Sequence, residues 1–172
     1  DLLCAPMLLT PRDEWAGLFN KLVAAGRATA VWLAMPPAAN SELRWVAAEV
    51  LPLVRALWPA MRAEPAVVLP AALDVEVDPD DAAVKLVRSH VQSSGPMTAR
   101  AIAAALLLDP LQVEAALAKL ELDGIVLQGQ FTGGVAETEW CERRILQRIH
   151  RLTLGRLRED IKPVAPAELV RF

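Results

Sequence analysis

The dipeptide Asp109-Pro110 constrains this chain most, because it ends one helix and begins another almost at once. The segment before it, from Met97, has Thr98 as a candidate helix cap and apolar residues at helical spacing. Asp109 can cap a second helix, and proline is favoured at the first helical position. Gly124 can end that second helix in a left-handed conformation. The pattern predicts two helices joined by a tight turn.

A short β-hairpin is predicted directly after this pair of helices. Residues 125–131 alternate in the period-2 manner of a half-buried strand, Gly133-Gly134 forms a tip, and the chain returns through Trp140-Cys141. Helix, turn, helix and hairpin in this order are typical of a winged helix-turn-helix. We therefore predict a mainly α fold with small β-hairpin wings, which belongs to the α+β class.

An internal repeat extends this prediction to the first third of the chain. The pattern Lys-Leu-x-x-x-Gly ends at Gly26 in the first copy and at Gly124 in the second. A strand is expected after each glycine, and the first hairpin should turn over residues 36–41. The returning strands carry Trp45 and Trp140, which we predict to be structural anchors. The sequence thus predicts tandem winged-helix modules.

Module boundaries follow from this repeat and from the proline content. Thr10-Pro11 takes the place of the Asp-Pro turn in the first copy, which lacks the opening helices, so we interpret the chain as a piece of a longer protein. Prolines and acidic residues predict an extended linker, after which Asp80 or Asp81 should cap a helix over 82–91. The predicted organisation is an incomplete winged-helix module (1–62), a linker (63–80), a complete module (81–158) and the start of a following element (159–172).

Positive charge is concentrated near the C-terminal end of a chain whose formal net charge is −3. The first 140 residues hold 10 Lys and Arg against 17 Asp and Glu, whereas the remaining 32 hold 8 against 4. Arg144, Arg148 and Arg151 share one face of the helix expected after the hairpin, with Arg143 at its start. We predict that this face contacts phosphates. The alternative is a solvated face that pairs with the acidic linker or a neighbouring domain.

The other helix faces are predicted to pack rather than to bind DNA. On the C-terminal helix, Ile145, Leu146, Ile149 and Leu152 are expected to form the buried side, and they match the apolar positions Val50, Leu51, Val54 and Leu57 of the first copy. The second helix of the turn has one cation against three acids, which is unfavourable for approaching phosphates. Packing against another module is the expected role of that helix.

Few other residues are candidates for binding or catalysis. Gln128 and Gln130 lie on one side of the predicted hairpin and are candidates for hydrogen bonds to a base, or else belong to its solvated face. His90 and His150 have no partner at a spacing suited to zinc or to a catalytic triad. We predict no catalytic residue and no metal site.

The segment from Glu139 to Phe172 resembles the large helicase-related (Lhr) family of bacterial superfamily 2 DNA helicases. That family has a GPFT-like turn, a winged helix, a Trp-Cys pair and a helix of the type LxRIHRxTLxxLRxxIxPV. The matching residues are Gly95-Pro96-Met97-Thr98, Trp140-Cys141, and Arg148-Ile149-His150-Arg151 through Pro163-Val164. The resemblance covers most of the chain and is most specific from Gly95 onward.

The resemblance implies a parent protein that is an ATP-dependent 3′ to 5′ DNA helicase, a hydrolase with a role in DNA repair. ATP and Mg would act in motor domains upstream of this chain. The chain itself would belong to a C-terminal extension of tandem winged helices, supporting DNA binding or assembly of that extension. Single-stranded or forked DNA and neighbouring domains of the helicase are the implied partners, in the cytoplasm and associated with the nucleoid.

Two other function classes stay open. A scaffold or oligomerisation module would bind protein, including a second copy, through the acidic turn helix and the tryptophan-rich faces. A winged-helix DNA glycosylase-like repair module would place Gln128 and Gln130 near a flipped base. Cys4 and Cys141 form no CxxC pair, which favours reduced thiols in the cytoplasm, although one long-range disulfide is compatible with the sequence. The longest apolar run, 101–108, is too short to span a bilayer, so no membrane partner is expected.

Overall fold

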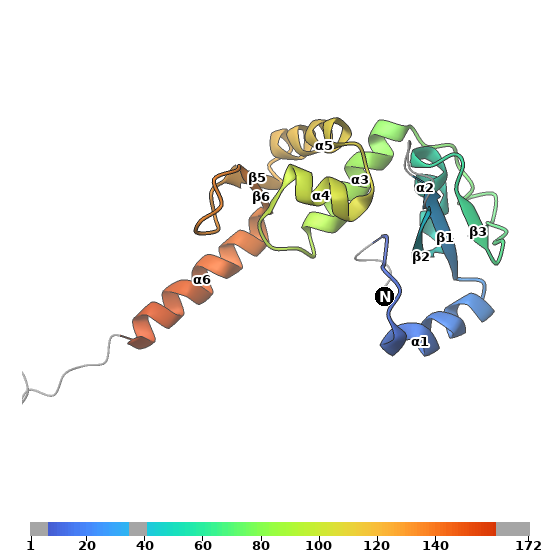
Figure 1. Cartoon of the computed structure of the whole chain (residues 1–172), viewed down its shortest axis with the longest axis horizontal. Helices are drawn as coiled ribbons and strands as arrows, with labels where there is room; N and C mark the ends of the chain where they lie inside the picture. Colours follow the sequence, from blue (N-terminus) through green and yellow to red (C-terminus); the bar gives the residue numbers. More distant parts are fainter. Residues whose placement is uncertain (1–6, 35–40, 161–172) are drawn as a thin grey trace, which may run out of the picture.

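Two halves of the chain share one hydrophobic core in the computed structural model, which describes residues 7–34 and 41–160 (Figure 1). The first half consists of α1 (Asp13–Ala24), β1 (Ala28–Ala34), β2 (Ser41–Ala47), the 3-10 turn η1 (Ala48–Val50), α2 (Leu51–Leu57) and β3 (Arg62–Glu64). Its three strands pair antiparallel in the order β2-β1-β3.

The second half has more helix and a smaller sheet. It consists of α3 (Pro79–Val91), β4 (Met97–Thr98), α4 (Ala99–Leu106), α5 (Pro110–Leu122), β5 (Val126–Gly129), β6 (Glu139–Glu142) and α6 (Arg143–Asp160). Its strands pair antiparallel in the order β4-β6-β5. The described residues thus form six α-helices and two small three-stranded antiparallel sheets, which confirms the predicted α+β class.

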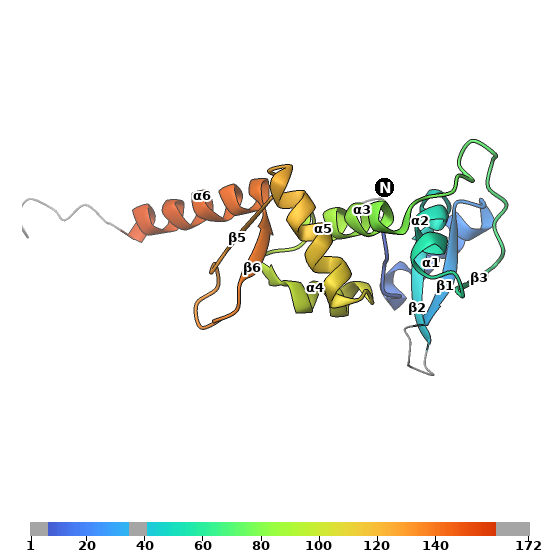
Figure 2. The same cartoon turned by 90° about the horizontal axis from the view of Figure 1, so that it is seen from above.

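The helix α3 joins the two halves. It packs on α2 of the first half and on α5 and α4 of the second, and both views place it between them (Figures 1 and 2). Leu86 and Val87 of α3 are at most 2% exposed and belong to the common core. The core is therefore continuous from one sheet to the other.

The predicted turn between two helices is present. The Thr98 hydroxyl accepts the Ala101 N–H (3.2 Å) at the start of α4, and the Asp109 carboxylate accepts the Leu111 N–H (2.8 Å) at the start of α5. Between the helices Leu107 adopts a left-handed conformation with φ 58°. The two helices are bent by 116° relative to one another. Among the described residues no single helix is long and apolar enough to cross a bilayer, although α4 and α5 together meet that length and composition as a bent pair.

The same backbone hydrogen bonds follow α1 and α5. Gly26 and Gly124 both have φ +67°, where glycine has no Cβ penalty. The bonds are Gly26 N–H to Val23 O, Arg27 N–H to Leu22 O and Ala48 N–H to Arg27 O in the first half, and Gly124 N–H to Glu121 O, Ile125 N–H to Leu120 O and Arg143 N–H to Ile125 O in the second. The first two bonds of each set form a Schellman motif, which ends the helix. The third bond closes the hairpin. The two halves therefore repeat one helix, turn and hairpin.

Two helix starts differ from the prediction. Asp78, rather than Asp80 or Asp81, caps α3, because its carboxylate accepts the N–H groups of both later residues at 2.9 and 3.2 Å. The helix accordingly begins at Pro79, where the missing N–H is not needed. In the first half, α1 begins at Asp13 without a side-chain cap, so Thr10 does not have the role of Asp109.

Strand boundaries also differ. Residues 62–64, at the edge of the expected linker, form β3 because they pair with Ala30, Val31 and Trp32 of β1. The strand β5 ends at Gly129 instead of residue 131. Most of the predicted first hairpin tip (36–41), most of the expected following element (159–172) and Cys4 lie outside the described residues.

Candidate nucleic-acid interface

The helix α6 is fixed to the body at its first turn. Glu142 is buried, and its carboxylate accepts the Ile145 N–H (2.9 Å), as expected of a helix N-cap. Beside this bond, the Arg143 N–H donates to the Ile125 carbonyl at 3.0 Å. Beyond this turn α6 projects away from both sheets, in both views (Figures 1 and 2).

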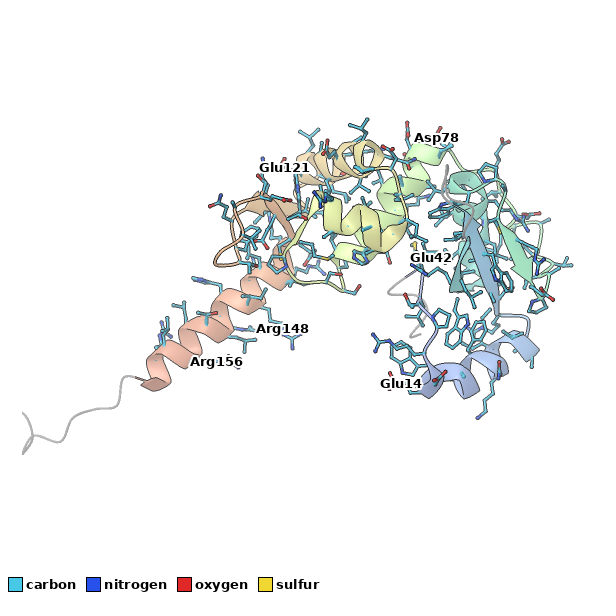
Figure 3. All side chains as sticks on the ribbon, viewed as in Figure 1. Glu14, Glu42, Asp78, Glu121, Arg148 and Arg156 are labelled. Atoms are coloured by element: carbon cyan, nitrogen blue, oxygen red, sulfur yellow. The ribbon has the colours of Figure 1, made fainter. Side chains whose placement is uncertain are left out.

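Arginines line one face of the projecting helix. Arg144, Arg148 and Arg151 are exposed and follow one another at i, i+4 and i+7. Arg158, seven residues after Arg151, continues this face and is also exposed, and its helical spacing is the sequence signal for it. Figure 3 shows Arg148 and Arg156 extending from α6 into open space. Among the side chains that the structure describes, which end at residue 158, no acidic group forms a salt bridge with an arginine of α6.

This helix is strongly cationic against an acidic chain. Residues 143–158 contain six arginines and no acidic residue, whereas the rest of the chain has 12 Lys and Arg against 21 Asp and Glu. Like charges on one helix face repel one another by a few tenths of a kcal/mol per pair. An anionic partner would remove this repulsion. Arginine forks fit both phosphate and carboxylate.

Arg143 lies apart from the other predicted arginines. Its Nη2 atom is 3.5 Å from the position that a Cβ atom on Gly124 would occupy, so its guanidinium group lies back over the turn between α5 and β5. The structure therefore does not bring Arg143 together with Arg144, Arg148 and Arg151.

The apolar stripe of α6 is more exposed than predicted. Ile145 and Leu146 are only half-buried, and Ile149 and Leu152 are 38% and 57% exposed. The equivalent residues Val50, Leu51 and Val54 of the first half are at most 5% exposed, and Leu57 is half-buried. The two helices differ in exposure because they have different neighbours. The helix α3 packs on α2, whereas α6 packs chiefly on β6 among the described elements.

The two predicted glutamines lie on the C-terminal hairpin, β5–β6. Gln128 is exposed and is paired with Trp140 across the hairpin. The amide Nε2 of Gln130 donates to the Ala136 carbonyl (3.2 Å), so this side chain binds within its own hairpin. Gln128 is thus a surface residue, whereas the amide of Gln130 is held by a contact within the hairpin.

A buried carboxylate organises the loop of the same hairpin. Glu139 is 3% exposed and accepts the N–H groups of Phe131 (2.8 Å) and Thr132 (2.6 Å). Burial alone would raise the pKa of Glu139, but the hydrogen bonds from Thr132 and Phe131 outweigh it and hold the pKa below its usual value. The carboxylate therefore stays ionised and shapes the hairpin.

The two predicted anchors occupy different environments. Trp45 is 8% exposed and stacks on Phe19, with ring centroids 4.1 Å apart and an interplanar angle of 6°. Trp140 is half-buried and packs against the common core.

The outer face of α5 is apolar and acidic. Leu111 and Leu122 are 75% and 90% exposed, with Glu114 and Glu121 along the same helix. Its one cation, Lys119, forms a salt bridge with Asp81 at 2.8 Å, which lowers the pKa of Asp81 and raises that of Lys119. This surface has no free cation for phosphate, although the second helix of such a turn normally enters the major groove.

The remaining candidates for chemistry are the cysteine and histidine side chains of the second half. Among the described residues, no group of three or more His, Cys, Asp or Glu side chains could hold a metal ion. Cys141 is fully buried, and burial together with Glu142 and Glu139 raises the pKa of its thiol. His150 is exposed on α6, and His90 lies on α3, half-buried.

No family model matches the chain, but comparison with known proteins shows a distant likeness. The chain is 26% identical over 87 residues to an "Lhr helicase/ probable uracil glycosylase" of Mycolicibacterium smegmatis. The aligned stretch is 51% of this chain and 6% of that protein, so the chain spans only a small part of its relative. The chain is thus distantly and partially similar to an Lhr helicase.

Proposed function

We propose that this chain is a non-catalytic, tandem winged-helix segment of an Lhr-type ATP-dependent 3′ to 5′ DNA helicase. It would support DNA binding through α6 or assembly of the C-terminal extension. The distant likeness to a protein named as an Lhr helicase supports this assignment. Hydrolysis of ATP with Mg is proposed for the parent protein and not for these residues.

The topology of the second half supports the winged-helix part of the proposal. Its order is helix, strand, helix, helix, strand, strand, helix, with the first strand pairing beside the returning strand of the hairpin. The 116° bend between α4 and α5 falls within the range of helix-turn-helix pairs. The shared Schellman turn and hairpin bond suggest that the first half is a shortened relative of the same unit.

The arginine face of α6 is the observation that carries the DNA-binding proposal. Arg144, Arg148 and Arg151 are exposed, and no described acidic residue pairs with them. Phosphate contacts dominate the affinity of proteins for DNA. We place the contact on α6 and not on α5, whose outer face repels phosphate.

Fluorescence anisotropy with single-stranded, forked and duplex DNA over a salt series tests whether the arginine face of α6 contacts DNA. Wild-type protein should bind, and its affinity should fall steeply with salt. The variant Arg144→Glu/Arg148→Glu/Arg151→Glu should lose most of this affinity, and for duplex DNA its log-log salt slope should become shallower by about 3.

A matched control separates local contact from net charge. Lys85→Glu/Arg88→Glu/Arg100→Glu makes the same change in net charge at exposed positions on α3 and α4. The control should retain more affinity than the α6 variant. Equal losses in the two variants, or no binding by folded wild-type protein at low salt, would refute DNA binding by α6.

Two other functions have narrower support. A protein-binding scaffold is favoured by the exposed leucines of α5. A glycosylase role is supported only by the name of the relative, because the buried carboxylates of Glu139 and Glu142 already accept hydrogen bonds from backbone N–H groups. Release of uracil from a uracil-containing oligonucleotide by this chain would revive the glycosylase alternative.

A further inference from the structure

One tryptophan of the first half lies outside the common core. Trp32, near the middle of β1, is half-buried and does not pack against the core cluster. The other four tryptophans belong to the core or pack against it: Trp15, Trp45, Trp58 and Trp140. The strand neighbours of Trp32, Val31 and Leu33, are at most 1% exposed. Because alternate residues of a strand point to opposite faces, Trp32 lies on the other face of the sheet.

The cross-strand neighbours of Trp32 extend this surface. The register pairs Trp32 with Leu43 of β2 and with Arg62 of β3. Leu43 is half-buried and, like Trp32, does not belong to the common core. The guanidinium group of Arg62 lies over the indole ring of Trp32, 5.1 Å from the ring centroid. Trp32, Leu43 and Arg62 together form the surface that we call the Trp32 platform.

Arg62 can exchange its present partners for others. Its side chain is 74% exposed and forms a salt bridge with Glu64 at 2.9 Å. Exposed ion pairs of this kind contribute little to stability, so a phosphate group can replace the carboxylate at small cost. The other acidic residue of this sheet, Glu42, forms a salt bridge with Arg44 at 2.6 Å. Both carboxylates of the sheet are thus paired with an arginine, which limits their repulsion of a phosphate.

A partly open indole ring beside an exposed guanidinium group suits an unpaired nucleobase. Every base has a π face, so stacking on an aromatic side chain tolerates any sequence. Bases within a duplex are held in the stack and do not offer this face to a protein. A single strand therefore presents to Trp32 a surface that duplex DNA does not.

We infer that the Trp32 platform binds single-stranded DNA. An unpaired base stacks on the Trp32 ring and contacts Leu43, while Arg62 moves from the ring to the adjoining phosphate. The inference rests on the proposed function, DNA binding by this chain, and adds a base contact to the phosphate contacts of α6. The sheet β2-β1-β3 and α6 lie at opposite ends of the molecule in both views (Figures 1 and 2). The two contacts can therefore be removed one at a time.

Fluorescence anisotropy with a thymidine strand and with an abasic strand of equal length tests the platform. The abasic strand keeps every phosphate but has no base to stack. Wild-type protein should bind the thymidine strand at least about fivefold more tightly, since one stacked base contributes that much affinity. Trp32→Leu removes the aromatic ring but keeps an apolar side chain. This variant should bind the two strands alike and should bind duplex DNA as wild type does.

Two further variants separate stacking from a structural effect. Trp32→Phe keeps an aromatic ring and should retain most of the preference for the thymidine strand. Trp15→Leu is the matched control, because Trp15 also has an arginine over its ring, Arg12 at 4.9 Å, but packs against the core. It should keep the preference in full. Circular dichroism verifies that each variant is folded.

Three results would overturn the inference: wild-type protein that binds the two strands equally or not at all, Trp32→Leu that keeps the preference, or an equal loss of preference in Trp15→Leu. Failure of DNA binding by α6 is recognised separately. Duplex DNA has no unpaired base, so its affinity reports the arginines of α6. The variant Arg144→Glu/Arg148→Glu/Arg151→Glu retains Trp32, so the ratio of its affinities for the two strands reports the platform.

Discussion

At the scale of single residues, His90 has an unusual environment on α3. Its Nε2 atom is buried and has no hydrogen-bond partner among the described residues. Its backbone carbonyl, in contrast, accepts the hydroxyl groups of Ser93 (3.1 Å) and Ser94 (2.8 Å). Burial lowers the pKa of the imidazole below its ordinary value of 6.5, because the charged form would lose its hydration.

This shift predicts a loss of stability in mild acid. The pKa of His90 is lower in the folded than in the unfolded chain. Its contribution to the free energy of unfolding is therefore fully present above pH 6.5 and is lost as the pH falls through the pKa of the folded state. The thermal midpoint should drop between pH 7 and pH 5. It should drop less in His90→Gln, which keeps a polar side chain but cannot titrate in this range. Equal drops in the two proteins would assign the effect to carboxylates instead.

At the scale of elements, the glycine that ends α5 is required by its backbone. Gly124 has φ +67°, and a Cβ atom there would meet only the Arg143 guanidinium group, at 3.5 Å. Gly124→Ala should therefore lower the free energy of unfolding by about 1 kcal/mol through the left-handed conformation. Gly26→Ala should do the same, since Gly26 has the same φ and occupies the equivalent turn.

Denaturant unfolding of these variants checks the repeat as well as the turn. Gly133→Ala is the control, because a Cβ atom there meets nothing within 4 Å and no left-handed φ is required. It should unfold like wild type. Should Gly124→Ala behave like Gly133→Ala, the Schellman turn would not be the reason for glycine at this position.

The sequence predicts elements whose ends are set by nearby residues, but not elements that depend on pairing with a distant segment. Thr98, Asp109 and Gly124 act on atoms within five residues, so their helix ends follow from residue type and spacing. The strand β3 has no such signal, because three residues are too few to show a period. Its position depends on pairing with β1, about thirty residues away.

The same distinction applies to the candidate site. Helical spacing identified which face of α6 is cationic and which is apolar. It could not determine what covers the apolar face, because that depends on a neighbour, as the contrast between α2 and α6 demonstrates. Residue spacing also could not predict that Arg143 turns away from the other arginines of α6, or that Gln130 forms a hydrogen bond within its own hairpin. Both side chains turn toward contacts that depend on the folded structure.

At the scale of the whole molecule, the common core predicts that the two halves unfold together. Leu86 of α3 is 2% exposed, and its replacement by alanine should lower the free energy of unfolding by about 2–5 kcal/mol. Four of the five tryptophans, Trp15, Trp32, Trp45 and Trp58, lie in the first half, outside α3. Tryptophan fluorescence and far-UV circular dichroism should therefore shift to lower denaturant together.

An exposed leucine provides the control for this measurement. Leu18→Ala, at a position 47% exposed on α1, should leave the midpoint nearly unchanged. If Leu86→Ala moved the circular dichroism transition and left the fluorescence transition in place, the halves would be independently stable.

The placement of α3 also limits how such a chain can be shortened or rearranged in evolution. By order along the chain α3 opens the second repeat, yet it covers α2 of the first. A gene break in the linker before residue 79 would separate α2 of the first repeat from the helix that packs on it. We therefore expect that a fragment which keeps the first half folded must extend through α3.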